Sequence, residues 1–261
     1  PLFDGRLGGL IDWNKAINPL AAAIKCCWRL TTVSPTYMRE LPLNAGNLAP
    51  LLQHEQAKAQ GILNGIDVQV WNPKIDHLIA INLKRSLKVF KNKNKIALKE
   101  KFTIQDDLAL ITFIGRLAGE KGANLLAPMI DRFLQTGNRA SFIILGTGEP
   151  QIHQALEELE QRYPDYVNVA LEYNEQRAHQ LYAGSDFLVM PSKVEPCGLN
   201  PMYSMRYGTI PVVRAVGGLK DTVTDIGEPK GRGIQLTHLH VNDAANSLHR
   251  AADLYPHKKQ F

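Results

Sequence analysis

The sequence contains few cysteines and no long apolar run. Its three cysteines, Cys26, Cys27 and Cys197, show neither a disulfide framework nor a C-x-x-C metal spacing, and the adjacent pair cannot easily bridge with itself. This usage indicates a reducing, cytoplasmic compartment. The most apolar early stretch, PLAAAIKCCW at 19–28, is short and interrupted by Lys25. It is therefore neither a membrane span nor a signal peptide.

The sequence also lacks internal repeats, and its excess positive charge is confined to one segment. Hydrophobic residues make up 44% and charged residues 21% of the 261 residues, which is typical of a soluble globular chain with one large or two medium domains. Residues 84–101 carry eight Lys/Arg and one Glu, more than the whole net charge of +5. We interpret this segment as the solvated face of a helix, with a polyanion site as the alternative. No nucleic-acid partner is expected.

From about residue 107 the chain alternates between unbroken apolar runs and amphipathic segments. Runs such as DLALITFIGRL and DFLVMPS do not alternate with polar residues, as in strands buried on both faces, and GANLLAPMIDRFLQ has helical spacing. Strands separated by helices predict an α/β fold with a doubly wound, parallel, Rossmann-like sheet. The expected strands are 107–117, 140–150, 167–173, 186–192 and 209–214, and the expected helices are 122–135, 151–163, 174–185, 200–208 and 217–223.

The part before residue 63 has a different pattern. We expect a helix at about 15–27, a short strand at 29–34 and a polar helix at about 50–60. The stretch LNGIDVQVWNP follows, with an expected turn at Asn64-Gly65, and we interpret it as the connection between two domains. The predicted division is therefore 1–62 and 63–261.

Ligands of doubly wound sheets bind outside the carboxyl ends of the strands, where the distinctive residues of this sequence lie. Arg116 and Lys121, in GRLAGEKG before a helix, would suit a phosphate or diphosphate, or would be plain surface cations. Gly146-Thr147-Gly148 and Gly217-Gly218 would offer backbone N–H groups to an anion, or would be plain turns. No G-K-[ST] follows Gly217-Gly218, so this is not a P-loop.

Glu195 is a single acid between a buried strand and a Pro-Cys-Gly turn. Burial of a carboxylate is costly without hydrogen-bond donors, and sugar hydroxyls or the backbone amides of 197–199 would supply them. The alternative is an acid that stabilises the start of the next helix. His238 and His240 lack a third metal ligand nearby, and Asp106-Asp107 precedes a strand, so we expect a solvated turn there and no metal site.

The stretch EPCGLNPMYSMRYGTIPVV at 195–213 resembles the bacterial glycogen synthases and plant starch synthases, which are retaining glucosyltransferases of the two-domain GT-B fold. FIGRLAGEKG, LGTGEP, VSPTYMREL and LNGIDVQVWNP support this resemblance in the family's order over most of 30–225. Many related retaining transferases carry a second Glu eight positions after the first. Here that position is Tyr203, as in the narrower family.

The resemblance implies roles for specific residues. Arg116 and Lys121 would hold the diphosphate of the donor, Glu195 would contact the donor glucose, and Tyr173 would stack on the base. No metal and no cofactor is implied. The implied catalytic residues are Arg116, Lys121 and Glu195, and the implied donor-binding residues are Gly146, Gly148, Tyr173, Cys197, Gly198, Leu199, Asn200, Gly217, Gly218, Leu219 and Thr222.

The implied reaction is the transfer of glucose, with retention, from a nucleotide-diphosphate glucose to the non-reducing end of an α-1,4-glucan, with ADP-glucose favoured over UDP-glucose. The compartment would be the cytoplasm, or the plastid for a plant protein. Two alternatives remain open. One is another GT-B transferase with a small or lipid acceptor, and the other is a glucan- or nucleotide-binding module without catalysis.

The resemblance also implies that this chain is the donor-binding part of a longer protein. Residues 1–62 would be a remnant of the N-terminal acceptor domain with the connection, and 63–261 would be the C-terminal nucleotide-sugar-binding domain, cut before its final helix. The family's Lys-x-Gly-Gly-Leu loop is not matched convincingly by RLGGL at 6–10. We therefore expect the chain by itself to be inactive, with the α-glucan held by the absent domain.

Overall fold

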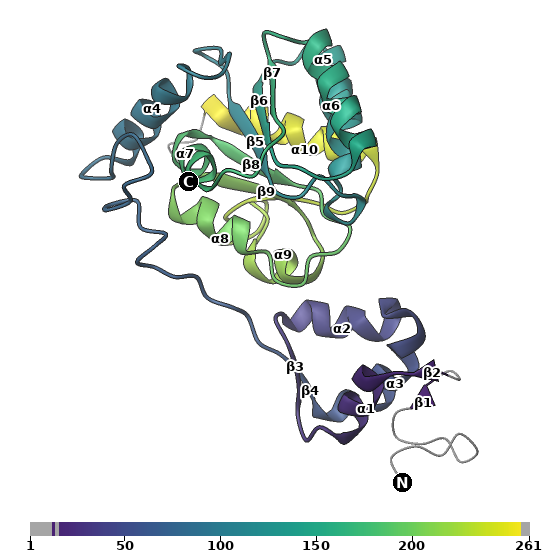
Figure 1. Ribbon diagram of the computed structural model, residues 1–261. Helices are drawn as coiled ribbons and strands as arrows, with labels where there is room; N and C mark the ends of the chain where they lie inside the picture. Colours follow the sequence, from purple (N-terminus) through teal and green to yellow (C-terminus); the bar gives the residue numbers. More distant parts are fainter. Residues whose placement is uncertain (1–11, 14–15, 257–261) are drawn as a thin grey trace.

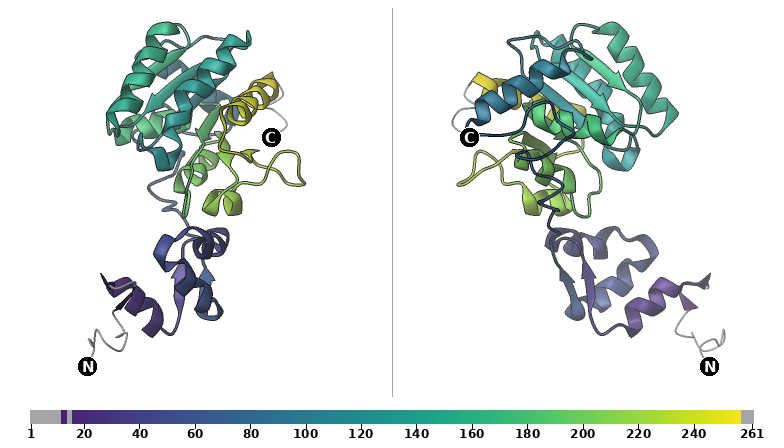
Figure 2. Two further views of the ribbon diagram at one scale, coloured as in Figure 1. Left: turned by 90° about the vertical axis from the view of Figure 1, so that its right-hand side faces the viewer. Right: turned by 60° about the vertical axis from the view of Figure 1, so that its left-hand side comes forward.

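The computed structural model describes residues 12–13 and 16–256, and these form two units (Figure 1). Residues 12–13 and 16–61 make a small unit of short helices and strands, and residues 87–256 make a larger α/β unit. The two views in Figure 2 show the small unit attached to one end of the larger one. Among the described residues, no helix is both long and apolar enough to span a membrane. The stretch RLGGL at 6–10 lies outside the described residues.

The larger unit is built on a six-stranded parallel sheet with the order β10-β9-β8-β5-β6-β7. Helices α5, α6 and α10 cover one face, and α4, α7, α8 and α9 cover the other. The predicted doubly wound fold is thereby confirmed. The strands are β5 (Leu110–Ile114), β6 (Ser141–Leu145), β7 (Val167–Ala170), β8 (Phe187–Met190), β9 (Ile210–Arg214) and β10 (Ile234–Leu236).

The helices predicted from residue 122 to 223 begin and end largely where the sequence places them. Asn174 opens α7 by accepting a hydrogen bond from the backbone N–H of Arg177, and Gly208 follows α8 in a left-handed conformation. The sequence interpretation missed β10, which ends at Leu236, and α10, which His240 caps. The helices are α4 (Leu87–Leu98), α5 (Leu126–Gln135), α6 (Pro150–Arg162), α7 (Glu175–Gly184), α8 (Leu199–Arg206), α9 (Gly217–Thr222) and α10 (Val241–Leu254).

The small unit contains a helix that the sequence interpretation missed. Helix α2 starts after Ser34, whose side chain caps it, and has a proline in its first turn; this Ser-Pro pair was the available signal. The polar helix expected at about 50–60 is shorter, since the chain turns into a strand at residue 59. The elements are β1 (Asp12–Trp13), β2 (Ala16–Ile17), α1 (Pro19–Cys26), β3 (Leu30–Thr32), α2 (Pro35–Asn44), α3 (Ala49–His54) and β4 (Ala59–Gly61).

The basic segment 84–101 contains α4 (Leu87–Leu98), but two of its lysines are buried. Lys91 Nζ donates to Thr209 Oγ1 at 2.6 Å and to two backbone carbonyl oxygens. Lys95 Nζ lies 2.8 Å from the buried Asp186 carboxylate. The prediction of a solvated face is therefore wrong for these two side chains, because their ammonium groups bind acceptors at the amino ends of the strands.

The connection between the units is anchored on the larger one. The Trp71 ring stacks between His179 and Tyr203, with centroid distances of 4.0 and 3.8 Å. Asp76 accepts a hydrogen bond from the Tyr207 hydroxyl at 2.5 Å and lies 2.7 Å from His179 Nδ1. Burial acts to raise the pKa of Asp76, but these bonds and one from a backbone N–H outweigh it, so the pKa lies below its ordinary value.

The turn in this connection lies later than expected. Residues 62–67 carry no turn, and the turn falls at 68–70 instead of Asn64-Gly65. Asp67 is the cause, because its carboxylate accepts from the backbone N–H of Gln69 and its carbonyl oxygen accepts from that of Trp71.

Candidate active site

A cavity of about 290 Å³ opens at the carboxyl ends of β5 and β8. The chain adds β6 and β7 on one side of β5 and then returns to place β8 on the other side, so this is the topological switch point of the sheet. Ligands of doubly wound folds bind at such a point. The lining residues are Phe113, Ile114, Gly115, Lys121, Met190, Ser192, Glu195, Cys197, Gly198, Leu199 and Asn200.

A close contact between two loops brings Lys121 to this cavity. Gly122 has a φ of 66°, and a Cβ there would lie 1.9 Å from the carbonyl oxygen of Pro191. The backbone N–H groups of Lys193 and Val194 both donate to the carbonyl oxygen of Glu120. The loop after β5 is thus fixed against the loop after β8. This contact brings Lys121 next to Glu195, although the two residues are 74 positions apart in the sequence.

Glu195 is buried and paired with that lysine. Its Oε2 lies 2.8 Å from Lys121 Nζ, and the Ser192 hydroxyl lies 3.3 Å from the same oxygen. The sequence interpretation placed both residues in one site but did not predict the ion pair, and it missed Ser192. A serine directly after the strand-ending Pro191 was the available signal. The cavity therefore contains a carboxylate whose charge is balanced by a lysine.

Eight of the fourteen predicted site residues lie outside the cavity lining, among them Arg116 and Tyr173. Arg116 follows β5, but its side chain is exposed and forms an ion pair with Glu120. Tyr173, after β7, is 89% exposed, so its ring is free to stack on a planar group.

Close backbone packing explains why glycine occupies positions 146 and 148. A Cβ at Gly146 would lie 1.9 Å from the carbonyl oxygen of Gly115, and one at Gly148 would lie 2.2 Å from that of Leu117. The backbone N–H of Leu117 also donates to the Thr147 carbonyl oxygen at 2.9 Å. The plain-turn alternative thus accounts for these glycines, since two neighbouring loops meet here backbone to backbone.

The amides of Gly217 and Gly218 are already hydrogen-bonded. Gly217 N–H donates to the Glu40 carboxylate at 3.1 Å, and Gly218 N–H donates to the carbonyl oxygen of Glu195 at 2.9 Å. Thr222 uses its hydroxyl within α9, on the Gly218 carbonyl oxygen at 2.8 Å. These contacts tie α9 to the loop that carries Glu195.

The turn after Glu195 closes one wall of the cavity. Gly198 is left-handed, and a Cβ on it would lie 2.7 Å from the buried side chain of Leu219. The Asn200 amide donates to the Ile114 carbonyl oxygen at 2.7 Å, which fixes the end of β5. Burial raises the pKa of the Cys197 thiol, and hydrogen bonds with Asn64 of the connection offset this rise only in part.

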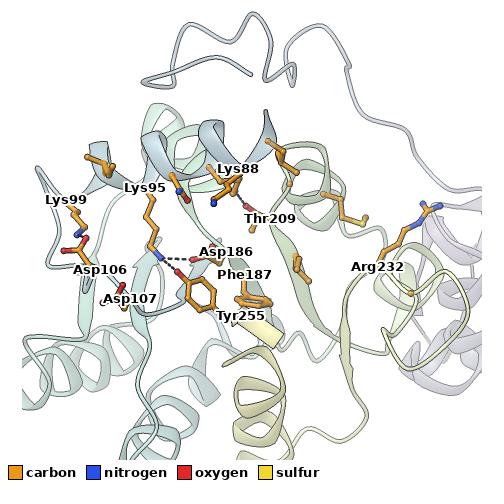
Figure 3. Close-up of a pocket in the computed structure, with 18 residues that line it drawn as sticks. Lys88, Lys95, Lys99, Asp106, Asp107, Asp186, Phe187, Thr209, Arg232 and Tyr255 are labelled. Atoms are coloured by element: carbon orange, nitrogen blue, oxygen red, sulfur yellow. Dashed lines mark hydrogen bonds and ion pairs between the residues drawn. The ribbon is translucent and has the colours of Figure 1, made fainter. Parts of the chain in front are cut away.

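A second cavity, of about 900 Å³, lies at the opposite edge of the sheet, at the amino ends of β8 and β9 (Figure 3). Lys95 is bonded there to Asp186, and Lys99 to Asp106, as the dashed lines show for Lys95. Asp106 and Asp107 lie in an exposed turn, as expected. Within residues 12–13 and 16–256, no group of three His, Cys, Asp or Glu side chains is arranged to hold a metal ion.

Comparison with known proteins identifies the family. Residues 94–255, more than half of the chain, match the glycosyl transferases group 1 family. The chain belongs to this family. Residues 7–54 also match the starch synthase catalytic domain. The larger unit is thus similar to part of the group 1 glycosyl transferases, and the small unit is similar to part of the starch synthases.

Comparisons with individual glycosyl transferases agree with this family assignment. The chain is 44% identical to a glycogen synthase of Flavobacterium johnsoniae and 37% identical to one of Streptococcus gordonii, covering 100% and 99% of this chain and 55% of each relative. The catalytic domain of starch synthase IV from Arabidopsis thaliana, solved with ADP and acarbose, matches with a TM-score of 0.83 and 36% identity, over 92% of this chain and 51% of that one. The chain thus spans about half the length of the curated relatives it matches.

Proposed function

We propose that the complete protein is a glycogen or starch synthase, a retaining glucosyltransferase, and that this chain is its donor-binding part. The observation that carries the proposal is the Lys121–Glu195 pair in a cavity at the switch point of the sheet. The glycogen synthase relatives and the ADP-bound starch synthase domain support it. We propose a nucleotide-diphosphate glucose, with ADP-glucose favoured, as the donor.

The reaction needs positive charge where the nucleoside diphosphate leaves. An ammonium group has three N–H donors, and Glu195 takes one from Lys121, which leaves donors for a phosphate oxygen. Arg116 at the end of β5 would add a second cation after leaving its exposed pair with Glu120. Fixed donors of this kind are often worth several kcal/mol in the transition state. With these cations in place, we propose that the reaction uses no metal.

The carboxylate has a different task. Glu195 would accept hydrogen bonds from hydroxyl groups of the donor glucose, so that the sugar is oriented while Lys121 faces the diphosphate. Cys197, Gly198, Leu199 and Asn200 would form the wall against which the sugar rests. We propose that the α-glucan acceptor binds mainly to parts of the protein beyond this chain, and that the reaction takes place in the cytoplasm, or in the plastid of a plant.

The test is glucosyl transfer to glycogen by the full-length protein, with ADP-glucose and UDP-glucose compared as donors. Arg116→Ala should lower kcat by about 100-fold or more without loss of folding, whereas Arg132→Ala on the exposed surface of α5 should leave it unchanged. Near-normal turnover of Arg116→Ala would overturn the assignment of Arg116, and absence of transfer by the unaltered protein would overturn the proposed function. The 261-residue chain alone should form no polymer.

A further inference from the structure

Helix α2 of the small unit packs against helix α9 of the larger one, and a carboxylate of α9 binds the start of α2 (Figure 1). Asp221 accepts hydrogen bonds from the Ser34 hydroxyl at 2.6 Å, the Thr36 backbone N–H at 2.8 Å and the Thr36 hydroxyl at 2.6 Å. Ser34 and Thr36 are buried. Burial acts to raise the pKa of Asp221, yet these bonds hold it below its ordinary value, so the carboxylate stays charged near neutral pH.

A carboxylate of α2 in turn binds the start of α9. Glu40, which follows Thr36 by one helical turn, accepts the backbone N–H of Gly217 at 3.1 Å. Each helix therefore receives an acid from the other at its N-terminus, where backbone N–H groups lack partners within the helix. We call this set, made of Ser34, Thr36, Glu40, Gly217 and Asp221, the reciprocal clasp.

The reciprocal clasp lies between the carboxyl edges of two parallel sheets. Ser34 follows the carboxyl end of β3, and β4 ends beside it at Gly61, where a Cβ would lie 2.3 Å from the Ser34 carbonyl oxygen. Gly217 follows the carboxyl end of β9 in the larger sheet. The carboxyl edges of the two sheets thus face each other, and this is the edge at which parallel sheets bind ligands.

The reciprocal clasp also reaches the candidate active site. Gly217 N–H is held by Glu40, and the next amide, Gly218 N–H, donates to the carbonyl oxygen of Glu195 at 2.9 Å. A Cβ on Gly217 would lie 2.1 Å from that same carbonyl oxygen, so the contact tolerates little displacement. Movement of α2 would therefore be passed through α9 to the backbone of Glu195.

We propose that the reciprocal clasp joins the two units in the closed state and sets the position of Glu195, with Asp221 and Glu40 as positioning residues for the transfer reaction. The catalytic part of this inference rests on the proposed function. The donor cavity is lined by the larger unit alone, so opening the clasp should spare nucleotide binding and impair the chemical step.

The test uses matched variants of the full-length protein. Asp221→Ala removes the acceptor of three hydrogen bonds, whereas Asp221→Asn retains one acceptor oxygen. Glu40→Ala removes the acceptor for Gly217, and Glu40→Gln retains it. Asp253→Ala, an exposed carboxylate of α10, is the control. We expect kcat to fall about tenfold in Asp221→Ala and Glu40→Ala, less in Asp221→Asn, and to recover in Glu40→Gln.

Two further readouts separate positioning from general destabilisation. The dissociation constant for ADP should stay within about twofold of the unaltered protein, while the radius of gyration from X-ray scattering should increase in Asp221→Ala. Unchanged kcat and radius of gyration, or ADP binding lost in proportion to kcat, would overturn the proposal. If Asp221→Ala does not fold, Thr36→Val and Asp221→Asn provide the same comparison. If the unaltered protein transfers no glucose, the proposed function fails while the scattering experiment still decides whether the clasp closes the units.

Discussion

At the scale of single residues, the ammonium group of Lys121 serves two anions in the proposed reaction, Glu195 and the donor diphosphate. Lys121→Met should therefore lower kcat by about 100-fold or more and, by leaving a buried carboxylate without its cation, lower the free energy of unfolding by about 1–3 kcal/mol. Steady-state transfer and urea unfolding of the full-length protein measure both. Lys101→Met, at an exposed lysine after α4, should change neither.

A double variant separates the two effects of that substitution. In Lys121→Met with Glu195→Gln the uncompensated charge is gone, so stability should recover while transfer stays low. Recovery of both would contradict a direct role of the ion pair in the reaction.

The residue types of the site could be predicted because they have few structural uses. An acid in the loop after an apolar strand and cations beside a helix start lie at the strand ends where ligands of such sheets bind. The partners could not be predicted, since Lys121 and Glu195 meet through a loop contact between distant segments. Lys91 and Lys95 show the same limit, because burial of a lysine depends on acceptors that only the folded chain brings near it.

At the scale of elements, the loop after β5 depends on one left-handed glycine packed against another backbone. Gly122 and Gly137 both have positive φ, of 66° and 84°, but a Cβ on Gly137 meets nothing within 4 Å. Replacement by alanine should cost about 1–2 kcal/mol at either position from backbone conformation alone. Gly122→Ala should cost about 1–3 kcal/mol more, because of the clash with Pro191, and should also lower transfer, since Lys121 is displaced.

Urea unfolding and transfer assays on the two alanine variants of the full-length protein provide the comparison. Equal losses of stability, with equal activities, would show that the loop contact has no role in placing Lys121.

The strands were predictable as elements because short unbroken apolar runs such as 187–190, bounded by turn residues, are typical of strands buried on both faces of a parallel sheet. The three-residue β10 was not, since so short a run shows no periodicity. Helix α2 was missed because its interior Pro42 and polar residues obscure helical spacing, although Ser34-Pro35 marks its start.

At the scale of the whole molecule, buried tyrosines hold the connection and the larger unit together and make stability depend on pH. Burial raises the pKa of Tyr182, and burial together with the bond to Asp76 raises that of Tyr207. Stability from a neutral buried tyrosine is fully present below the unfolded pKa of about 10 and is lost as pH rises towards the folded pKa. The free energy of unfolding should therefore fall by about 1.4 kcal/mol per tyrosine for each pH unit above 10.

Urea unfolding followed by tryptophan fluorescence between pH 7 and 11 measures this slope. Tyr207→Phe should be less stable at pH 7, because Asp76 loses a donor, but should have a shallower alkaline slope. Tyr173→Phe, at a tyrosine that is 89% exposed, is the control and should keep both values. An unchanged slope in Tyr207→Phe would contradict the assignment.

The anchoring of Trp71 also fixes the length of the tether between the two units. From Gly61, the last residue of β4, to Trp71 the chain has nine intervening residues, 62–70, and Trp71 and Asp76 are held on the larger unit. Within these nine residues, Asn64 also hydrogen-bonds Cys197 of the larger unit. Fully extended, such a tether spans about 30 Å. Tethers this short keep the effective concentration of one partner at the other in the millimolar range. Whenever the two units separate, Asp221 and the start of α2 would therefore stay close enough for their hydrogen bonds to form again rapidly.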